Sequence, residues 1–120
     1  MKCVIIDDEP LAVDLIKEFV SKVESLELIS TFNNAIDAIA MINTSNVDLI
    51  FLDIEMPHFS GLEILDFFEP SQVQFSIIFT TAYHHYAIEA LKIAAVDYLL
   101  KPIDPKELIN CIERCAVLES

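Results

Sequence analysis

Glycine, tryptophan and basic residues are scarce in this chain of 120 residues. It contains one glycine, Gly61, and no tryptophan. Phosphate-binding loops that are built from several glycines are therefore disfavoured. Seven lysines and arginines stand against 20 acidic residues, which gives a formal net charge of −13. Because so negative a surface repels phosphate backbones, we predict that this chain does not itself bind DNA or RNA.

Cysteines and long apolar runs are also few. The three cysteines, Cys3, Cys111 and Cys115, show no spacing typical of a disulfide framework. Their odd number indicates a reducing compartment and favours a role in packing. No signal peptide is visible in the sequence, and no apolar run approaches the roughly 18 residues that a membrane span requires. We therefore expect a cytoplasmic protein without membrane contact.

Hydrophobic residues, in contrast, are abundant, at 54% of the chain. The length predicts a single domain over residues 1–120 that can bury a core. Short apolar runs alternate with amphipathic helical patterns, which predicts an α/β fold with a doubly wound, mainly parallel sheet. The second run is the most polar and is placed at an edge, which gives the strand order 2-1-3-4-5. The five expected strands cover 3–6, 26–32, 49–52, 77–80 and 96–100, and the five expected helices cover 10–23, 35–42, 62–68, 84–94 and 105–118.

Acidic, hydroxyl and basic side chains follow four of these runs. Asp7 and Asp8 follow the first run, and Asp53 ends the third. Thr81 follows the fourth run, and Lys101 follows the fifth. In open α/β sheets, ligands bind beyond the carboxyl ends of the strands, at the point where the strand order reverses. We therefore expect these five side chains to meet in one pocket.

Such a pocket suits a hard cation and a phosphoryl group. Carboxylate oxygens are typical ligands of Mg²⁺, and the carboxylate of Asp53 is the best candidate to accept a phosphoryl group. Lys101 would neutralise one phosphoryl oxygen, and a cis bond to Pro102 would aim its ammonium group inward. Thr81 would donate to another oxygen. Its rival Thr80 points to the opposite face of the strand, because side chains alternate along a strand.

Four short motifs carry a resemblance to a known family. They are IIDDEP at 5–10, LDIEMP at 52–57 with Gly61, TTA at 80–82 and DYLLKP at 97–102. Together they resemble the CheY-like receiver domain of two-component response regulators, over essentially the whole chain. Segments 81–90 and 97–103 look most like the LytR/AgrA type. The resemblance implies a flavodoxin-like fold.

The resemblance also implies roles for the acidic residues. Asp53 takes a phosphoryl group from a phosphohistidine on a sensor histidine kinase. Asp7 and Asp8 hold Mg²⁺ together with Asp53 and the backbone carbonyl of Glu55. The protein is then a switch that catalyses its own phosphorylation and dephosphorylation, and not an enzyme that turns over outside substrates.

Further roles are implied for the residues around the phosphoryl group. Thr81 and Lys101 bind it, and the inward movement of Thr81 is coupled to a swing of Tyr98. That swing reshapes the face made by the fourth helix, the fifth strand and the fifth helix, which then forms a homodimer or meets an output partner. Glu55 and Tyr83 modulate the lifetime of the phosphoryl group.

Other interpretations stay open at this point. Regulators of the LytR/AgrA type carry a DNA-binding domain after the receiver, and residues 1–120 contain none, so the chain is either a piece of a transcriptional regulator or a stand-alone receiver that acts by protein contacts. An aspartate-nucleophile phosphatase would need a second Asp where Glu55 stands. A nucleotide or flavin carrier would need a phosphate loop where the acidic residues 7–9 stand. A degenerate receiver would lack the complete set of acids, threonine and lysine.

Overall fold

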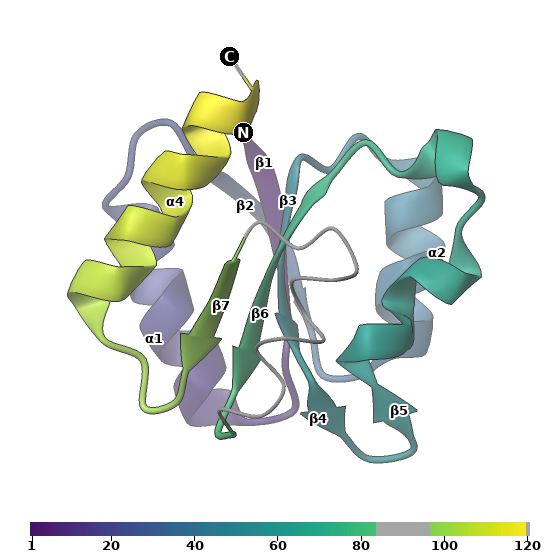
Figure 1. Ribbon diagram of the computed structural model, residues 1–120, viewed down its shortest axis with the longest axis horizontal. Coiled ribbons are helices and arrows are strands. Elements are labelled where there is room, and N and C mark those ends of the chain that lie inside the picture. The colour runs from purple at the N-terminus through teal and green to yellow at the C-terminus, as the bar shows by residue number, and fades with distance from the viewer. Residues whose placement is uncertain (84–96, 120) are drawn as a thin grey trace.

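The computed structural model describes residues 1–83 and 97–119 (Figure 1). A five-stranded sheet lies between two layers of helices, which confirms the predicted α/β class. The sheet strands are β1 (Lys2–Ile6), β2 (Glu27–Phe32), β3 (Leu49–Asp53), β6 (Ser76–Thr81) and β7 (Asp97–Leu100). The α-helices are α1 (Pro10–Ser21), α2 (Ala35–Thr44) and α4 (Pro105–Glu119). The remaining elements are the short strands β4 (Glu55–Met56) and β5 (Phe59–Ser60) and the 3-10 helices η1 (Gly61–Phe67) and η2 (Pro70–Gln72).

All neighbouring strands of the sheet are parallel, in the order β2-β1-β3-β6-β7. Counted without the separate hairpin β4–β5, this is the predicted order 2-1-3-4-5. Strand β3 lies at the centre and is buried along its whole length, whereas β2 alternates between exposed and half-buried residues at an edge. The polarity of each run therefore predicted its place in the sheet.

Alternating side chains of the sheet feed two separate cores. On β1, Val4 and Ile6 join the core beneath α2 and η1, and Cys3 and Ile5 join the core beneath α1 and α4. The second core also holds two cysteines and two aliphatic residues of α4 (Leu108, Cys111, Ile112, Cys115). The predicted packing role of the cysteines is confirmed by their burial.

Local sequence signals explain where the helices begin. Pro10 opens α1, where the missing N–H of proline is harmless. Asn34 caps α2, because its side chain accepts a hydrogen bond from the N–H of Asp37 at 3.0 Å. Before α4, the side chain of Asp104 accepts from the N–H of Lys106 at 2.9 Å. Each of these helices begins shortly after the carboxyl end of a strand, so the loops between strand and helix carry the polar side chains at that edge of the sheet.

Two details differ from the expectation. The segment after β3 lies outside the expected strands and helices, but its residues pair as the hairpin β4–β5, with His58 at a φ of 63° in the turn. The helix expected over 62–68 is the 3-10 helix η1. Pro70 follows shortly after η1 and disfavours the α-helical conformation at the residue before it, so the segment does not continue as a longer α-helix.

Four of the five expected helices lie in the described part of the chain, and the one expected over 84–94 lies outside it. Within residues 1–83 and 97–119, no helix has the length and apolar character needed to cross a membrane.

Candidate functional site

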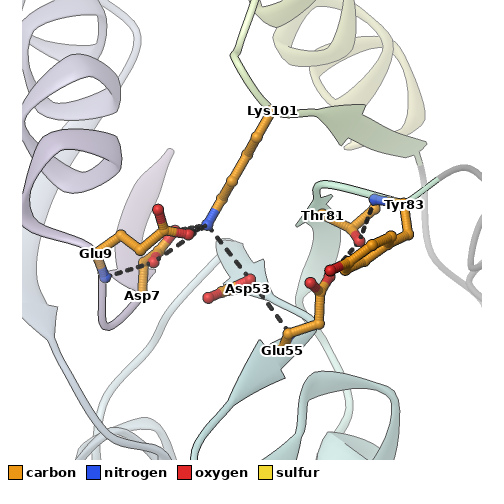
Figure 2. A network of polar contacts seen from close by, with 7 residues as sticks. All are labelled: Asp7, Glu9, Asp53, Glu55, Thr81, Tyr83 and Lys101. Carbon is orange, nitrogen blue, oxygen red and sulfur yellow. Dashed lines mark hydrogen bonds and ion pairs between the residues drawn. The ribbon is translucent and has the colours of Figure 1, made fainter.

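The strand ends bring the predicted side chains together at one edge of the sheet (Figure 2). Asp7 follows β1, Asp53 ends β3, Thr81 ends β6 and Lys101 follows β7. Asp7, Asp53 and Thr81 are each at least 98% buried, which is unusual for polar side chains. These residues lie far apart in the sequence, and the parallel register of the strands places them side by side.

Three carboxylates form the acidic part of the site. One oxygen from each of Asp7, Asp8 and Asp53 lies within 4.8 Å of the other two. Among the residues that the structure describes, the buried Oδ2 of Asp53 has no hydrogen-bond partner, and the buried Oδ2 of Asp7 has only the ion pair with Nζ of Lys101 at 3.1 Å. Buried acceptors without donors are costly, and a cation that prefers oxygen ligands would satisfy them. The three carboxylates therefore fit Mg²⁺.

The electrostatics of Asp53 show the same need for a cation. Burial raises the pKa of Asp53 from 3.8 to about 8, and the nearby charge of Asp7 adds to this effect. Lys101 opposes the shift, while the neighbouring carboxyl group of Asp8 increases it. The negative charge of Asp53 is therefore unfavourable here without additional positive charge.

Lys101 supplies part of that positive charge. Its Nζ lies 3.1 Å from Oδ2 of Asp7, 3.5 Å from Oδ1 of Asp53 and 2.5 Å from Oε1 of Glu9. The peptide bond between Lys101 and Pro102 is cis, as expected. Burial lowers the pKa of Lys101, but the hydrogen bond with Glu9 and the charges of Asp53 and Asp7 together raise it above its ordinary value. The ammonium group is therefore charged at neutral pH.

Thr81 makes two hydrogen bonds through its hydroxyl group. The hydroxyl donates to the carboxylate of Glu55 and accepts from the backbone N–H of Tyr83 at 3.1 Å. Glu55 in turn donates its own backbone N–H to Oδ1 of Asp53 at 3.2 Å. The hydroxyl of Thr80 is buried and has no hydrogen-bond partner within the described ranges. Thr81 therefore faces the site, with its hydroxyl directed to Glu55.

Two side-chain contacts were not predicted from the sequence. Glu9 reaches Lys101 across 92 residues, and Glu55 reaches Thr81 across 26 residues. Glu9 does follow the acidic pair, and its N–H donates to Oδ1 of Asp7 at 2.8 Å, which is a local turn signal. Neither local pattern specifies the distant partner.

The remaining predicted residues lie around this centre. Tyr98 on β7 is half-buried and packs against the core beneath α2 and η1. The side chain of Tyr83 is 52% exposed and lies beside Thr81 in Figure 2. Gly61 lies against the acceptor strand: a Cβ atom there would be 2.4 Å from the carbonyl oxygen of Asp53. The only glycine of the chain therefore allows the loop to pack directly behind Asp53. The roles expected for Tyr98 and Tyr83 stay predictions.

Comparison with known proteins identifies the family. Residues 3–113 match the response regulator receiver domain. The chain belongs to this family. The receiver domain is 39% identical over 114 residues to the transcriptional regulatory protein BtsR of Escherichia coli strain K12, and 38% identical over 114 residues to an uncharacterized response regulatory protein of Vibrio vulnificus. Each match covers 95% of this chain and 47% of the relative.

Solved receiver domains have the same fold. The response regulatory domain of mrkE from Klebsiella pneumoniae matches with a TM-score of 0.86 and 29% identity, covering 98% of this chain and 97% of that one. The REC domain of AraT from Geobacillus stearothermophilus matches with a TM-score of 0.85 and 30% identity, covering 98% and 95%. The receiver domain described here is therefore part of two-component signalling, and it spans about half the length of the curated relatives it matches.

Proposed function

We propose that Asp53 accepts a phosphoryl group from a phosphohistidine of a sensor histidine kinase, in a reaction that depends on Mg²⁺. The observation that carries the proposal is the cluster of Asp7, Asp8 and Asp53, in which one oxygen from each lies within 4.8 Å of the other two and the buried Oδ2 of Asp53 has no hydrogen-bond partner among the described residues. The ammonium group of Lys101 lies beside these carboxylates, with its Nζ 3.5 Å from Oδ1 of Asp53. Membership of the receiver family supports this assignment.

The side chains divide the chemistry between them. A carboxylate oxygen of Asp53 forms a bond to phosphorus while the bond from phosphorus to the donor imidazole nitrogen breaks, and the bonding pair stays on that nitrogen. Lys101 stabilises negative charge on one phosphoryl oxygen, and the hydroxyl of Thr81 donates to another. Asp7, Asp8, Asp53 and the backbone carbonyl of Glu55 would hold Mg²⁺, which supplies charge neutralisation for the phosphoryl oxygens.

The domain then acts as a switch, and it is not an enzyme that turns over outside substrates. It catalyses its own phosphorylation and later hydrolysis, and Glu55 and Tyr83 flank the phosphoryl position and modulate its lifetime. Tyr98 connects the site to the face formed by β7, α4 and the helix expected over 84–94. The described part of that face consists of β7 and α4, and it is the surface we propose for homodimerisation or output contacts.

The output is proposed to be control of transcription. The relative from Escherichia coli is named a transcriptional regulatory protein, and it is about twice as long as this chain. A DNA-binding domain of the LytR/AgrA type in a longer protein fits the motifs in 81–90 and 97–103. A stand-alone receiver that acts through protein contacts is the alternative, and the sequence that follows residue 120 in the gene distinguishes the two.

The acceptor assignment can be tested with a small phosphodonor. The protein is incubated with acetyl phosphate and Mg²⁺, and its intact mass is measured. We expect one phosphoryl adduct, which disappears in Asp53→Asn and in the presence of EDTA. Asp66→Asn, at an exposed acid on η1, is the matched control and should be phosphorylated normally. An adduct that persists in Asp53→Asn would falsify the assignment, and steady release of phosphate from small monoesters would favour a phosphatase.

A further inference from the structure

The hydroxyl proton of Thr81 already has an acceptor. A threonine hydroxyl has one proton to donate, and in this structure the proton is directed to the carboxylate of Glu55. The oxygen of the same hydroxyl accepts from the N–H of Tyr83. The hydroxyl therefore cannot donate to a phosphoryl oxygen until it leaves Glu55.

Lys101 is in a comparable position. An ammonium group has three N–H donors, and three carboxylates lie within 3.5 Å of its Nζ, those of Asp7, Glu9 and Asp53. The side chains of Asp7 and Asp53 are 1% and 2% exposed, but that of Glu9 is 62% exposed. An exposed ion pair is the least costly to break, because water replaces the lost partner. Glu9 is therefore the partner that Lys101 can release.

We propose that Glu9 and Glu55 are positioning residues that hold Lys101 and Thr81 in place of the phosphoryl oxygens. Carboxylate and phosphoryl oxygens are both anionic acceptors that form charge-assisted hydrogen bonds. Phosphorylation of Asp53 is then an exchange, in which the two glutamates release the two donors to the phosphoryl group. This inference rests on the proposed function of the site.

The exchange has a consequence for binding strength. Each hydrogen bond that the phosphoryl group forms with Lys101 or Thr81 replaces one that a glutamate accepts in the unphosphorylated protein. The glutamates therefore lower the affinity of the site for phosphoryl-like ligands. They also keep the donors oriented while the site is unphosphorylated. Weakening either glutamate should strengthen binding of a phosphoryl analogue without destabilising the fold.

The test for Glu55 uses beryllofluoride, an analogue of the phosphoryl group, together with Mg²⁺. Glu55→Gln keeps the side-chain length but removes the charge, and Glu55→Asp keeps the charge but shortens the reach to Thr81. Both variants weaken the hydrogen bond that Thr81 donates, because the amide oxygen of glutamine accepts it without the assistance of a charge and aspartate is too short to reach it. Each should bind beryllofluoride up to about fivefold more tightly, since one intramolecular hydrogen bond contributes about 1 kcal/mol. Glu63→Gln, at an exposed acid on η1, is the matched control and should change the affinity less than about twofold.

A spectroscopic measurement separates this role from a structural one. The amide N–H of Tyr83 donates to the hydroxyl of Thr81 and reports on its environment. In Glu55→Gln and Glu55→Asp without ligand, the NMR signal of this amide should move toward its position in the ligand-bound wild type. The melting temperature should stay within the range of Glu63→Gln. An unmoved amide signal would contradict the exchange at Thr81.

Glu9 is tested in the same titration. Glu9→Gln should bind beryllofluoride about two- to fivefold more tightly, the range expected for an exposed ion pair. Asp14→Asn is its control, because Asp14 is exposed and lines the groove beside Asp7 and Asp8 but has no described contact with Lys101. If the glutamate variants bind no more tightly than their controls, the inference is wrong and the proposed function stands. If the wild type binds no beryllofluoride, the proposed function itself fails, and this inference fails with it.

Discussion

Replacing Asp53 by asparagine should stabilise the folded domain at neutral pH in the absence of Mg²⁺. Burial, followed by the charge of Asp7, raises the pKa of Asp53 from 3.8 to about 8. The folded protein therefore keeps a proton that the unfolded chain loses above about pH 4. The stability that this proton contributes is complete below the unfolded pKa and is lost as the pH rises to about 8. Asparagine does not titrate, so the variant should keep this stability as the pH rises.

The magnitude follows from the size of the shift. Between 3.8 and neutral pH the difference spans about three pH units, each equivalent to about 1.4 kcal/mol, which sets a ceiling of about 4 kcal/mol. The amide of asparagine would be buried in turn, and Lys101 would lose one charged partner, so only part of this gain is realised. We therefore expect Asp53→Asn to gain about 1–3 kcal/mol, or about 4–12 °C in melting temperature for a domain of this size.

Urea unfolding in EDTA at several pH values measures this difference. The advantage of Asp53→Asn over the wild type should be small near pH 4, should grow up to about pH 8 and should then level off. Added Mg²⁺ should reduce the advantage, because a ligand of the folded state stabilises the wild type. Asp66→Asn, at an exposed acid, is the matched control. An advantage that is constant across this range, or a wild type that is the more stable at the alkaline end, would refute the reasoning.

Three further substitutions test the surroundings of the site. Gly61→Ala should destabilise the domain by about 1–3 kcal/mol in urea unfolding and slow its phosphorylation, because the new Cβ would collide with the carbonyl oxygen of Asp53. Unchanged stability and an unchanged rate of phosphorylation would show that the loop adapts freely. Asn34→Ala should cost about 1 kcal/mol through loss of the cap of α2, with phosphorylation unchanged, and equal melting curves would argue against the cap. Tyr83→Ala should shorten the half-life of the phosphorylated protein, because the ring shields the acyl phosphate from water, and an unchanged half-life would end that explanation.

The sequence predicted the sheet and its polar edge because each depends on a local signal. Asp53 is placed by the apolar run before it, and the choice of Thr81 over Thr80 follows from the two-residue period of a strand. The contacts of Glu9 and Glu55 had no such signal, because each joins side chains brought together only by the parallel register of distant strands. Hairpin β4–β5 was missed because two-residue strands are too short to show a period.

The alternation of side chains on β7 also determines which part of the protein a conformational change at the site can reach. Tyr98 packs against the core beneath α2 and η1, and the next residue, Leu99, packs against the core beneath α1 and α4. A reorientation of the Tyr98 ring would therefore act first on the layer of α2 and η1 and on the edge of the sheet formed by β7. A partner that responds to this tyrosine would contact the protein along that edge, which belongs to the face of β7 and α4 proposed for output contacts.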